Sequence, residues 1–250
     1  MKNGMKILLT VIGFFVAWEL LVIIFKIPPY LLPKPSIIFL TIFNNFGTLS
    51  THTWWTTYEI ILGFLIAVIV AMAVSILAIY SKYVNNVIHP ILVVVQVIPK
   101  VAIAPLLLIW MGYGLGPKIL IATLTCFFPI VIGLKKGLDL TDQQLIDTMR
   151  SIGSSRWQIL TKIQFPFSLP HFFSGLKVGI SLAAVGAIIA EFVNATKGLG
   201  YFINYSAAFI DTPKVFAGIF LTVFIGILLY VIIALLEKKI VFWEKERIFS

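Results

Sequence analysis

The sequence has little charge and almost no cysteine. Asp, Glu, Lys and Arg make up 12% of the 250 residues, about half of their share in an ordinary soluble domain. Hydrophobic residues make up 60% and the mean hydropathy is +1.05, more apolar surface than a soluble globule of this size can bury. The composition therefore excludes a soluble domain and indicates an integral membrane protein.

Motifs for metal binding, disulfide formation and nucleotide binding are also missing from the sequence. Cys126 has no second cysteine to pair with, and His52, His89 and His171 are far apart, without an HExxH or CxxC motif beside them. There is no G-x-x-x-x-G-K-[ST] loop, and the glycine-rich segment 112–117 is expected to be an external turn. We therefore expect no catalytic residue, no metal site and no cofactor on this chain.

Long apolar runs are the main structural signal. A helix needs about 20 apolar residues to cross a bilayer core of roughly 30 Å. Six runs are that long: 7–25, 57–80, 86–110, 118–136, 172–192 and 215–236. The first run exceeds the core of a signal peptide and no A-x-A-like site follows it, which favours a retained span over a signal peptide. The prediction is an all-α polytopic membrane protein, with six transmembrane helices in one domain covering residues 1–250.

The distribution of Lys and Arg predicts the orientation of these spans. An excess of positive charge can indicate nucleic-acid binding, but here it is better explained by basic loops retained in the cytoplasm. Twelve basic residues fall on one side: Lys2, Lys6, Lys82, Lys135, Lys136, Arg150, Arg156, Lys162, Lys238, Lys239, Lys245 and Arg247. Five fall on the other: Lys26, Lys34, Lys118, Lys197 and Lys214. The first side is therefore predicted to be cytoplasmic, with both termini inside and no nucleic-acid partner.

A hydrophilic insertion at 137–170 separates the fourth and fifth apolar runs. Thr141 with Gln144 and Ser155 with Gln158 have the spacing of capping boxes, which predicts two short amphipathic helices. Two prolines are expected to end the second helix before the fifth span: Pro166 and Pro170.

The function of this helix pair has two interpretations. The helices could pack on the cytoplasmic ends of the protein's own spans. Alternatively, they could form a rigid projection that docks in a groove of a partner, with Gly153 as a left-handed elbow between them.

Residues 147–166 resemble the EAA loop of binding-protein-dependent ABC importer permeases. That motif has a Glu-Ala-Ala triplet, three residues, a glycine, nine residues, an isoleucine and a proline shortly after. Asp147-Thr148-Met149 stands at the triplet, Gly153 at the glycine, and Ile163 and Pro166 at the last two positions. Asp replaces Glu and Thr-Met replaces Ala-Ala, so the contact of this helix with a partner is expected to depart from the family pattern.

Further segments extend the resemblance over nearly the whole chain, toward nitrate/sulfonate/taurine-type permeases with the type I importer fold. They are Leu32 to Ser36 (LPKPS), Ile98 to Pro105 (IPKVAIAP), Ala190 to Phe192 (AEF) and Lys197 to Tyr201 (KGLGY).

The resemblance implies a permease subunit of the bacterial plasma (inner) membrane that pairs with a second copy. Its partners would be a homodimer of ABC ATPase subunits, which hold ATP and Mg, and an extracellular or periplasmic solute-binding protein. The loop would couple the chain to the ATPase through Asp147, Thr148, Met149, Arg150, Gly153, Arg156, Trp157, Ile163 and Pro166. Relatives of this type import nitrate, taurine, alkanesulfonates or vitamin-related heterocycles, and the binding protein mainly sets the choice.

Prolines and charges inside the spans mark candidates for the translocation path or a gate: Pro99, Lys100, Pro105 and Glu191. A proline breaks the helical backbone, which membranes tolerate where the break lines a wet cavity; simple bending for better packing is the alternative. Glu191 is placed at an outer gate, Lys177 is expected to extend toward the interface, and Glu59 is expected to be an interface residue at the start of the second span. The apolar loop 194–214 is expected to contain a short helix at the outer surface.

Two other function classes are considered. A secondary transporter driven by an ion gradient would need paired intramembrane acids or unwound helices in two related halves, and only Glu191 fits. An intramembrane enzyme would need a nucleophile and a base, and Ser181 and His171 stand in no catalytic motif. An ATP-driven importer moving its solute by alternating access is the favoured interpretation.

Overall fold

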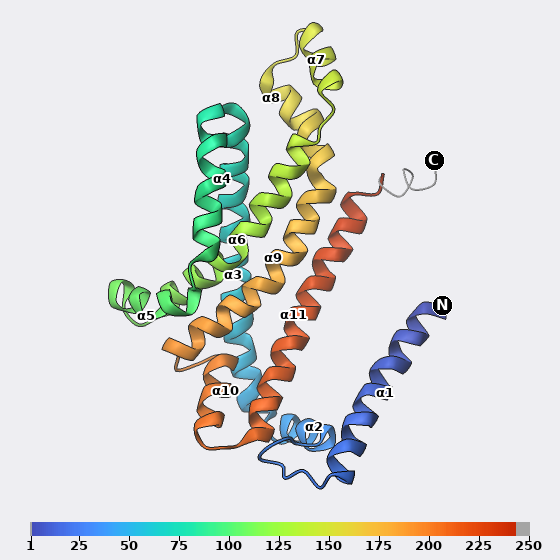
Figure 1. Cartoon of the computed structure of the whole chain (residues 1–250), viewed down its shortest axis with the longest axis vertical. Helices are drawn as coiled ribbons and strands as arrows, with labels where there is room; N and C mark the ends of the chain where they lie inside the picture. Colours follow the sequence, from blue (N-terminus) through green and yellow to red (C-terminus); the bar gives the residue numbers. More distant parts are fainter. Residues whose placement is uncertain (1, 244–250) are drawn as a thin grey trace.

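The computed structural model describes residues 2–243; within that range, the side chains of 2–4, 7–8, 82, 85–86, 88–89, 92–93 and 194 are not described. Every regular element in the described range is helical (Figure 1). The α-helices are α1 Lys2–Ile24, α2 Pro35–Asn44, α3 Phe46–Tyr80, α4 Lys82–Val97, α5 Lys100–Met111, α6 Leu115–Asp139, α7 Gln143–Ser151, α8 Arg156–Ile159, α9 Phe165–Asn194, α10 Leu199–Ala208 and α11 Thr212–Ile240. A π-helix, Leu160–Gln164, joins α8 to α9.

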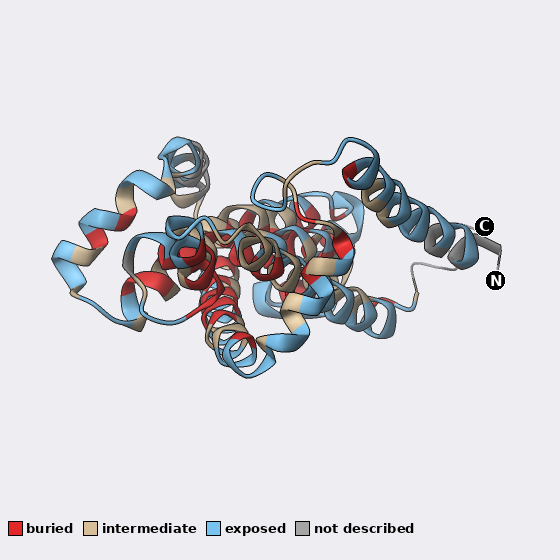
Figure 2. Ribbon diagram, turned by 90° about the horizontal axis from the view of Figure 1, so that it is seen from below, coloured by how far each residue is buried: buried red, intermediate tan, exposed pale blue. Residues whose placement is uncertain are grey.

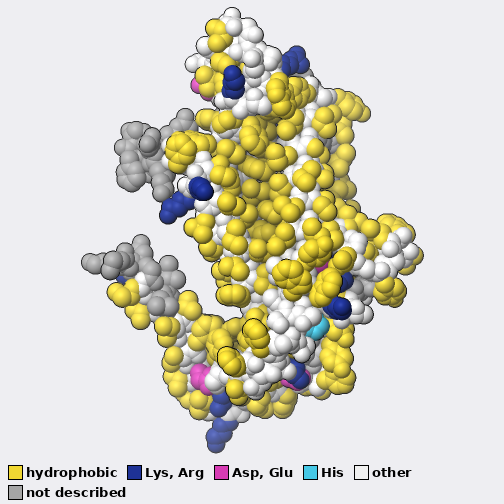
Figure 3. Space-filling model, turned by 180° about the vertical axis from the view of Figure 1, so that it is seen from behind, with side chains coloured by type: hydrophobic (Ala, Val, Ile, Leu, Met, Phe, Trp, Pro, Cys, Tyr) yellow, Lys and Arg dark blue, Asp and Glu magenta, His cyan; other side chains and the backbone are white. Residues whose placement is uncertain are grey.

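Four helices are long and apolar enough to cross a membrane: Phe46–Tyr80, Leu115–Asp139, Arg156–Val193 and Thr212–Ile240. The predicted runs 57–80, 118–136, 172–192 and 215–236 lie inside them. Shorter apolar helices cover Leu9–Ile24, Pro35–Asn44 and Lys100–Met111. Hydrophobic side chains cover most of the face shown in Figure 3, and the few Lys and Arg side chains lie mainly at its top, its bottom and its edges, as expected for a surface that largely faces lipid.

The predicted run 86–110 is divided between α4 and α5. The break falls at Ile98 and Pro99, both with extended backbone. Proline has no N–H to donate and disfavours a helical conformation in the residue before it, so the helix ends there and a new one begins. In Figure 1, α4 lies beside α3, while α5 runs in a different direction and packs with Ala104 and Leu107 on α6 and α9.

Pro166 and Pro170 do not end a helix, contrary to the prediction from sequence. Pro166 lies in the first turn of α9 and Pro170 lies within it, and the helical stretch is continuous from Arg156 to Val193. For Pro166 the physical reason is the π-helix that precedes it, since its wider i→i+5 turn leaves backbone groups free where the proline supplies no donor. Pro170 lies where α9 packs closely on α6, and membrane helices tolerate a proline where a neighbouring helix supports the backbone.

The two predicted helix starts have different outcomes. The capping box of Ser155 and Gln158 is confirmed, with both reciprocal hydrogen bonds formed. The prediction of a capping box at Thr141 is wrong, because Asp142 is the N-cap of α7 and its side chain accepts a hydrogen bond from the Gln144 N–H at 2.9 Å. A short helix in the segment 194–214 is confirmed as α10, while its place at the outer surface stays a prediction.

The core is built around a close approach of α6 and α9, and its buried residues concentrate in the central bundle (Figure 2). Gly133 and Gly137 on α6 face α9, and Gly175 and Gly179 on α9 face α6. A Cβ on Gly175 would lie 2.7 Å from the Pro129 carbonyl oxygen, and one on Gly133 would lie 2.7 Å from that of His171. Each helix thus presents a small-xxx-small pair, which lets two backbones approach inside a membrane.

We predict that Gly175→Ala destabilises the protein by about 1–3 kcal/mol, because its methyl group would have to separate two backbones. Thermal unfolding of the purified chain in detergent measures the effect. Gly226→Ala in α11 is the matched control, since nothing lies within 4 Å of its Cβ position and alanine favours a helix. Equal stability of the two variants would show that α6 and α9 can separate at little cost.

Candidate functional site

Helices α7 and α8 form a projection beyond the ends of α6 and α9 (Figure 1). The turn between them is a Schellman motif: the Gly153 N–H donates to the Arg150 carbonyl and the Ser154 N–H to the Met149 carbonyl, each at 3.0 Å. Gly153 has φ +80° and nothing within 4 Å of its Cβ position. The glycine is therefore required by the backbone conformation and not by crowding.

The residues predicted to couple the chain to a partner lie on or below this projection. Asp147 and Arg150 are exposed and form an ion pair of 3.3 Å. Trp157 is 61% exposed and Ile152 71% exposed, so the projection presents two large apolar side chains beyond the ends of the long helices. The remaining members differ in exposure: Thr148 and Arg156 are exposed, and Met149, Ile163 and Pro166 are partly buried.

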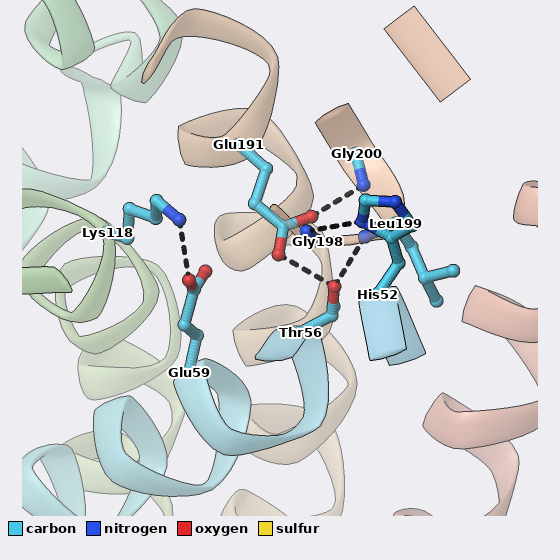
Figure 4. Close-up of polar contacts among 8 residues, drawn as sticks. All are labelled: His52, Thr56, Glu59, Lys118, Glu191, Gly198, Leu199 and Gly200. Carbon is cyan, nitrogen blue, oxygen red and sulfur yellow. Dashed lines mark hydrogen bonds and ion pairs between the residues drawn. The ribbon is translucent and has the colours of Figure 1, made fainter. Parts of the chain in front are cut away.

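A second cluster of polar groups lies buried at the opposite end of the bundle, where α10 begins (Figure 4). Three successive N–H groups at this helix start are bound by side chains of other helices. The Gly198 N–H donates to His52 Nδ1 at 3.0 Å, the Leu199 N–H to Thr56 Oγ1 at 2.7 Å, and the Gly200 N–H to Glu191 Oε2. Because the first N–H groups of a helix have no partner within it, α3 and α9 together cap α10.

Glu191 is the centre of this arrangement and is only 1% exposed. Its Oε1 accepts from the Thr56 hydroxyl at 2.7 Å, and its carboxyl group lies at the positive end of α10. The chain comes so close that a Cβ on Gly198 would overlap the carboxylate, and one on Gly200 would lie 2.7 Å from the Glu191 Cβ. The two glycines are thus needed for the contact.

Glu59 lies beside Glu191 and is fully buried, at 0% exposure. Its Oε1 accepts from Lys118 Nζ at 2.7 Å, while Oε2 has no hydrogen-bond partner. The expectation that Glu59 is an interface residue at the start of a span stays a prediction. Helix α3 begins at Phe46, so Glu59 lies well inside the helix. Removal of Lys118 would leave the Glu59 carboxyl buried without its ion-pair partner, which destabilises a fold.

The other candidates for the translocation path lie on or next to α5. Pro99 precedes its first residue, and Pro105 lies within it and is exposed. Lys100 donates from Nζ to the Gln96 carbonyl oxygen at 2.6 Å. Glu191 belongs to the cap of α10, and Lys177, predicted to extend toward the interface, forms an ion pair of 2.7 Å with Glu237. A role for Pro99, Lys100 and Pro105 in transport stays a prediction.

The far end of α10 carries backbone strain. Its last turn is also a Schellman motif, with the Asp211 N–H donating to the Ser206 carbonyl at 3.0 Å. The left-handed position is occupied by Ile210, at φ +57°, where a β-branched residue is a genuine outlier. Helix α10 is therefore held at its first residues by hydrogen bonds to α3 and α9, and ends at a residue with a strained backbone.

Sequence reasoning identified Glu191 but missed His52 and Thr56. The sequence did contain a signal for a buried polar cluster. Two acids and Lys118 lie in otherwise apolar helices, and charged side chains in such helices are usually paired. The threonine and histidine of α3 gave no signal of their own, because polar residues near a helix end are common and their partners are more than a hundred residues away in the sequence.

We predict that Thr56→Val frees the Leu199 N–H and speeds its hydrogen exchange about tenfold, the equivalent of losing one buried hydrogen bond of about 1–2 kcal/mol. Exchange measured by mass spectrometry on the full chain resolves the segment 198–204. Thr57→Val is the control, because the Thr57 hydroxyl bonds only to the Thr53 carbonyl of its own helix. Equal exchange in the two variants would contradict the capping role.

The chain matches known proteins along most of its length. The model of the family described as "Binding-protein-dependent transport system inner membrane component" matches residues 63–242. A probable ABC transporter permease protein of Haemophilus influenzae is 34% identical, over 90% of this chain and 92% of that protein. The formylaminopyrimidine transport permease protein ThiX of Halalkalibacterium halodurans is 33% identical, over 88% of each chain. The riboflavin transport system permease protein RibX of Chloroflexus aurantiacus is 33% identical, over 94% of this chain and 88% of that protein.

Among solved structures, a chain of the MetNI methionine ABC transporter in an inward-facing conformation has the same fold. The TM-score is 0.69 at 18% identity, and the match covers 78% of this chain and 97% of that chain. With a family model that spans more than half of the sequence, the chain belongs to the binding-protein-dependent transport system inner membrane components, the non-catalytic permease subunits of ABC importers.

Proposed function

We propose that this permease works as a homodimer with two ABC ATPase subunits and receives its solute from an external binding protein. The α7–α8 projection is the observation that carries this proposal. It exposes Trp157 and Ile152 on a rigid, doubly hydrogen-bonded turn, which suits a part that transmits force to a partner groove. A secondary transporter needs no such partner surface.

The proposed topology has six spans with both termini in the cytoplasm. The spans are α1, α3, α4 with α5 as one broken crossing, α6, α9 and α11, and the α7–α8 projection faces the cytoplasm. The count of basic residues supports this orientation. Lys245 and Arg247 lie outside the described residues, as do the side chains of Lys2 and Lys82.

Helix α10 is proposed as part of the outer gate. Its start is held to α3 and α9 by the capping contacts of Thr56 and Glu191. A rearrangement of α3 against α9 during alternating access would therefore move α10, and the strained Ile210 at its end stores energy that such a movement can release.

A vitamin-related nitrogen heterocycle is the proposed solute class. Relatives named for formylaminopyrimidine and riboflavin transport are 33% identical to this chain. Relatives named for aliphatic sulfonate and taurine transport, at 32% and 30%, make a sulfonate the second candidate. Competition by each unlabelled solute against uptake of a labelled formylaminopyrimidine distinguishes the two.

We predict that Gly153→Val lowers ATP-driven uptake at least about tenfold, because a β-branched residue at φ +80° would unfold the elbow. Uptake is measured in proteoliposomes that contain the chain, its ATPase and its binding protein. Gly153→Asn should retain uptake, because asparagine tolerates the left-handed region.

Gly112→Val is the matched control for backbone strain. Gly112 has φ +74° and also has nothing within 4 Å of its Cβ position, but it lies between α5 and α6. Normal uptake by Gly153→Val would contradict the coupling role, and solute uptake without any ATPase would contradict the proposed function as a whole.

The topology is tested by cysteine labelling in a Cys126→Ser background. Ile152, at the elbow, is 71% exposed, and Tyr113, between α5 and α6, is 90% exposed. On intact cells a membrane-impermeant maleimide should label Tyr113→Cys and not Ile152→Cys, with the opposite result on inside-out vesicles. Labelling of both variants from one side would contradict the proposed orientation.

A further inference from the structure

Two adjoining cavities lie between the α7–α8 projection and the bundle. The larger, of about 430 Å³, is lined by Tyr80 at the end of α3, Arg150 of α7 and Arg156 of α8. The smaller, of about 240 Å³, is lined by Ser75 of α3 and by Thr141. Gln143 and Gln164 line both cavities, so the two lie side by side.

The lining of these cavities is positively charged. Among the described residues around the larger cavity there are two arginines and no acid. Arg150 is 3.3 Å from Asp147, which lies outside the lining, and that exposed contact is weak. In the smaller cavity, Lys135 and Asp139 neutralise each other in an ion pair of 2.7 Å. The two guanidinium groups thus leave a net positive charge.

Two buried hydroxyl groups in the smaller cavity lack hydrogen-bond partners. Ser75 is 1% exposed and Thr141 is 7% exposed, and Ser75 Oγ and Thr141 Oγ1 have no partner. They are two of the four such side-chain atoms in the described part of the chain. Because a buried polar atom without a partner is costly, these hydroxyls indicate that something in the cavity completes their bonding.

We propose that the two cavities form a binding site for a phosphate group, which is distinct from the path of the transported solute. Guanidinium groups match the oxygens of phosphate in paired hydrogen bonds, so Arg150 and Arg156 would hold the charge. Gln143, Gln164, Ser75 and Thr141 would add neutral donors. The group belongs either to the headgroup of an anionic lipid in the adjacent leaflet or to a soluble phosphate.

The two arginines lie on either side of the elbow, so a ligand bound to both would affect the projection. Arg150 precedes the Gly153 elbow and Arg156 follows it. A phosphate bound to both would tie α7 and α8 to the end of α3, and would fix the direction in which the projection points. The site would then adjust how firmly the projection is held to the bundle.

The test measures binding by the purified full chain and does not depend on transport. The melting temperature in detergent is followed against inorganic phosphate, with chloride at matched ionic strength. A second series compares nanodiscs of phosphatidylglycerol with nanodiscs of phosphatidylcholine. We expect phosphate, phosphatidylglycerol or both to raise the melting temperature of the unaltered chain.

Three variants locate the site. Arg150→Gln with Arg156→Gln should weaken binding at least about tenfold. Ser75→Ala with Thr141→Val keeps both arginines and should weaken binding about threefold. This variant should fold, because it removes only hydroxyl groups whose burial without a partner is unfavourable. Lys238→Gln with Lys239→Gln is the control, because it removes two exposed cations from the last turn of α11 and should leave binding within twofold.

Each outcome decides the proposal. A response to phosphate alone identifies a soluble ligand, and a response to phosphatidylglycerol alone identifies a lipid; both support the site if the arginine variant abolishes them and the lysine variant does not. The absence of any response would overturn the proposal and leave water as the partner of the two hydroxyls. An equal response in the arginine and lysine variants would also overturn it, because it would reflect general surface charge.

Discussion

The close approach of α6 and α9 is the contact on which the other helices depend. It requires that neither helix carry a Cβ at the crossing, and Gly133, Gly137, Gly175 and Gly179 meet this requirement. In a membrane there is no hydrophobic drive between helices, so tight packing must supply the attraction. Helix α3 packs on the same pair, with Gly63 only 2.6 Å from the Ala122 Cβ when given a side chain of its own. The three helices thus form a rigid centre to which the others are attached.

The two ends of this centre are built on different physical principles. At one end, the α7–α8 projection exposes apolar side chains, and its shape is set by local backbone hydrogen bonds and a glycine. At the other, α10 has no side-chain cap of its own and takes its caps from α3 and α9. The first end can keep its shape while it moves as a unit, whereas the second changes whenever its neighbouring helices shift. The two ends therefore differ in how strongly their shape depends on the packing of the long helices.

The charges in the apolar helices show how such a fold tolerates them. Lys118 pairs with Glu59, and Lys177 pairs with Glu237 from helices far apart in the sequence. Glu191 instead accepts hydrogen bonds from backbone and hydroxyl donors, which makes its carboxyl group part of the α10 cap. Each of these side chains is therefore a link between helices, and its loss would weaken a helix–helix contact more than a local one.

Composition and local pattern were enough to predict the class, the apolar helices and the elbow. A bilayer demands long apolar helices whatever their packing, and the left-handed Gly153 and the Ser155 cap depend only on neighbouring residues. The glycine pairs of α6 and α9 have the spacing of small-xxx-small motifs, but that spacing does not say which helix packs against which. From the sequence, Arg150 and Arg156 were predicted only as members of the coupling loop and not as parts of a phosphate site.

Tertiary structure alone decided where distant residues meet. The pairing of Glu59 with Lys118 and the capping of Leu199 by Thr56 join residues 59 and 143 positions apart, and no local pattern encodes such contacts. The helix also continues past Pro166 and Pro170, with a π-helix before the first and close packing on α6 at the second, which no local pattern predicted. Sequence determined what each helix is, because that depends on solvent and neighbours in the chain. Packing determined what each polar side chain does, because buried charges take whichever partner the fold brings to them.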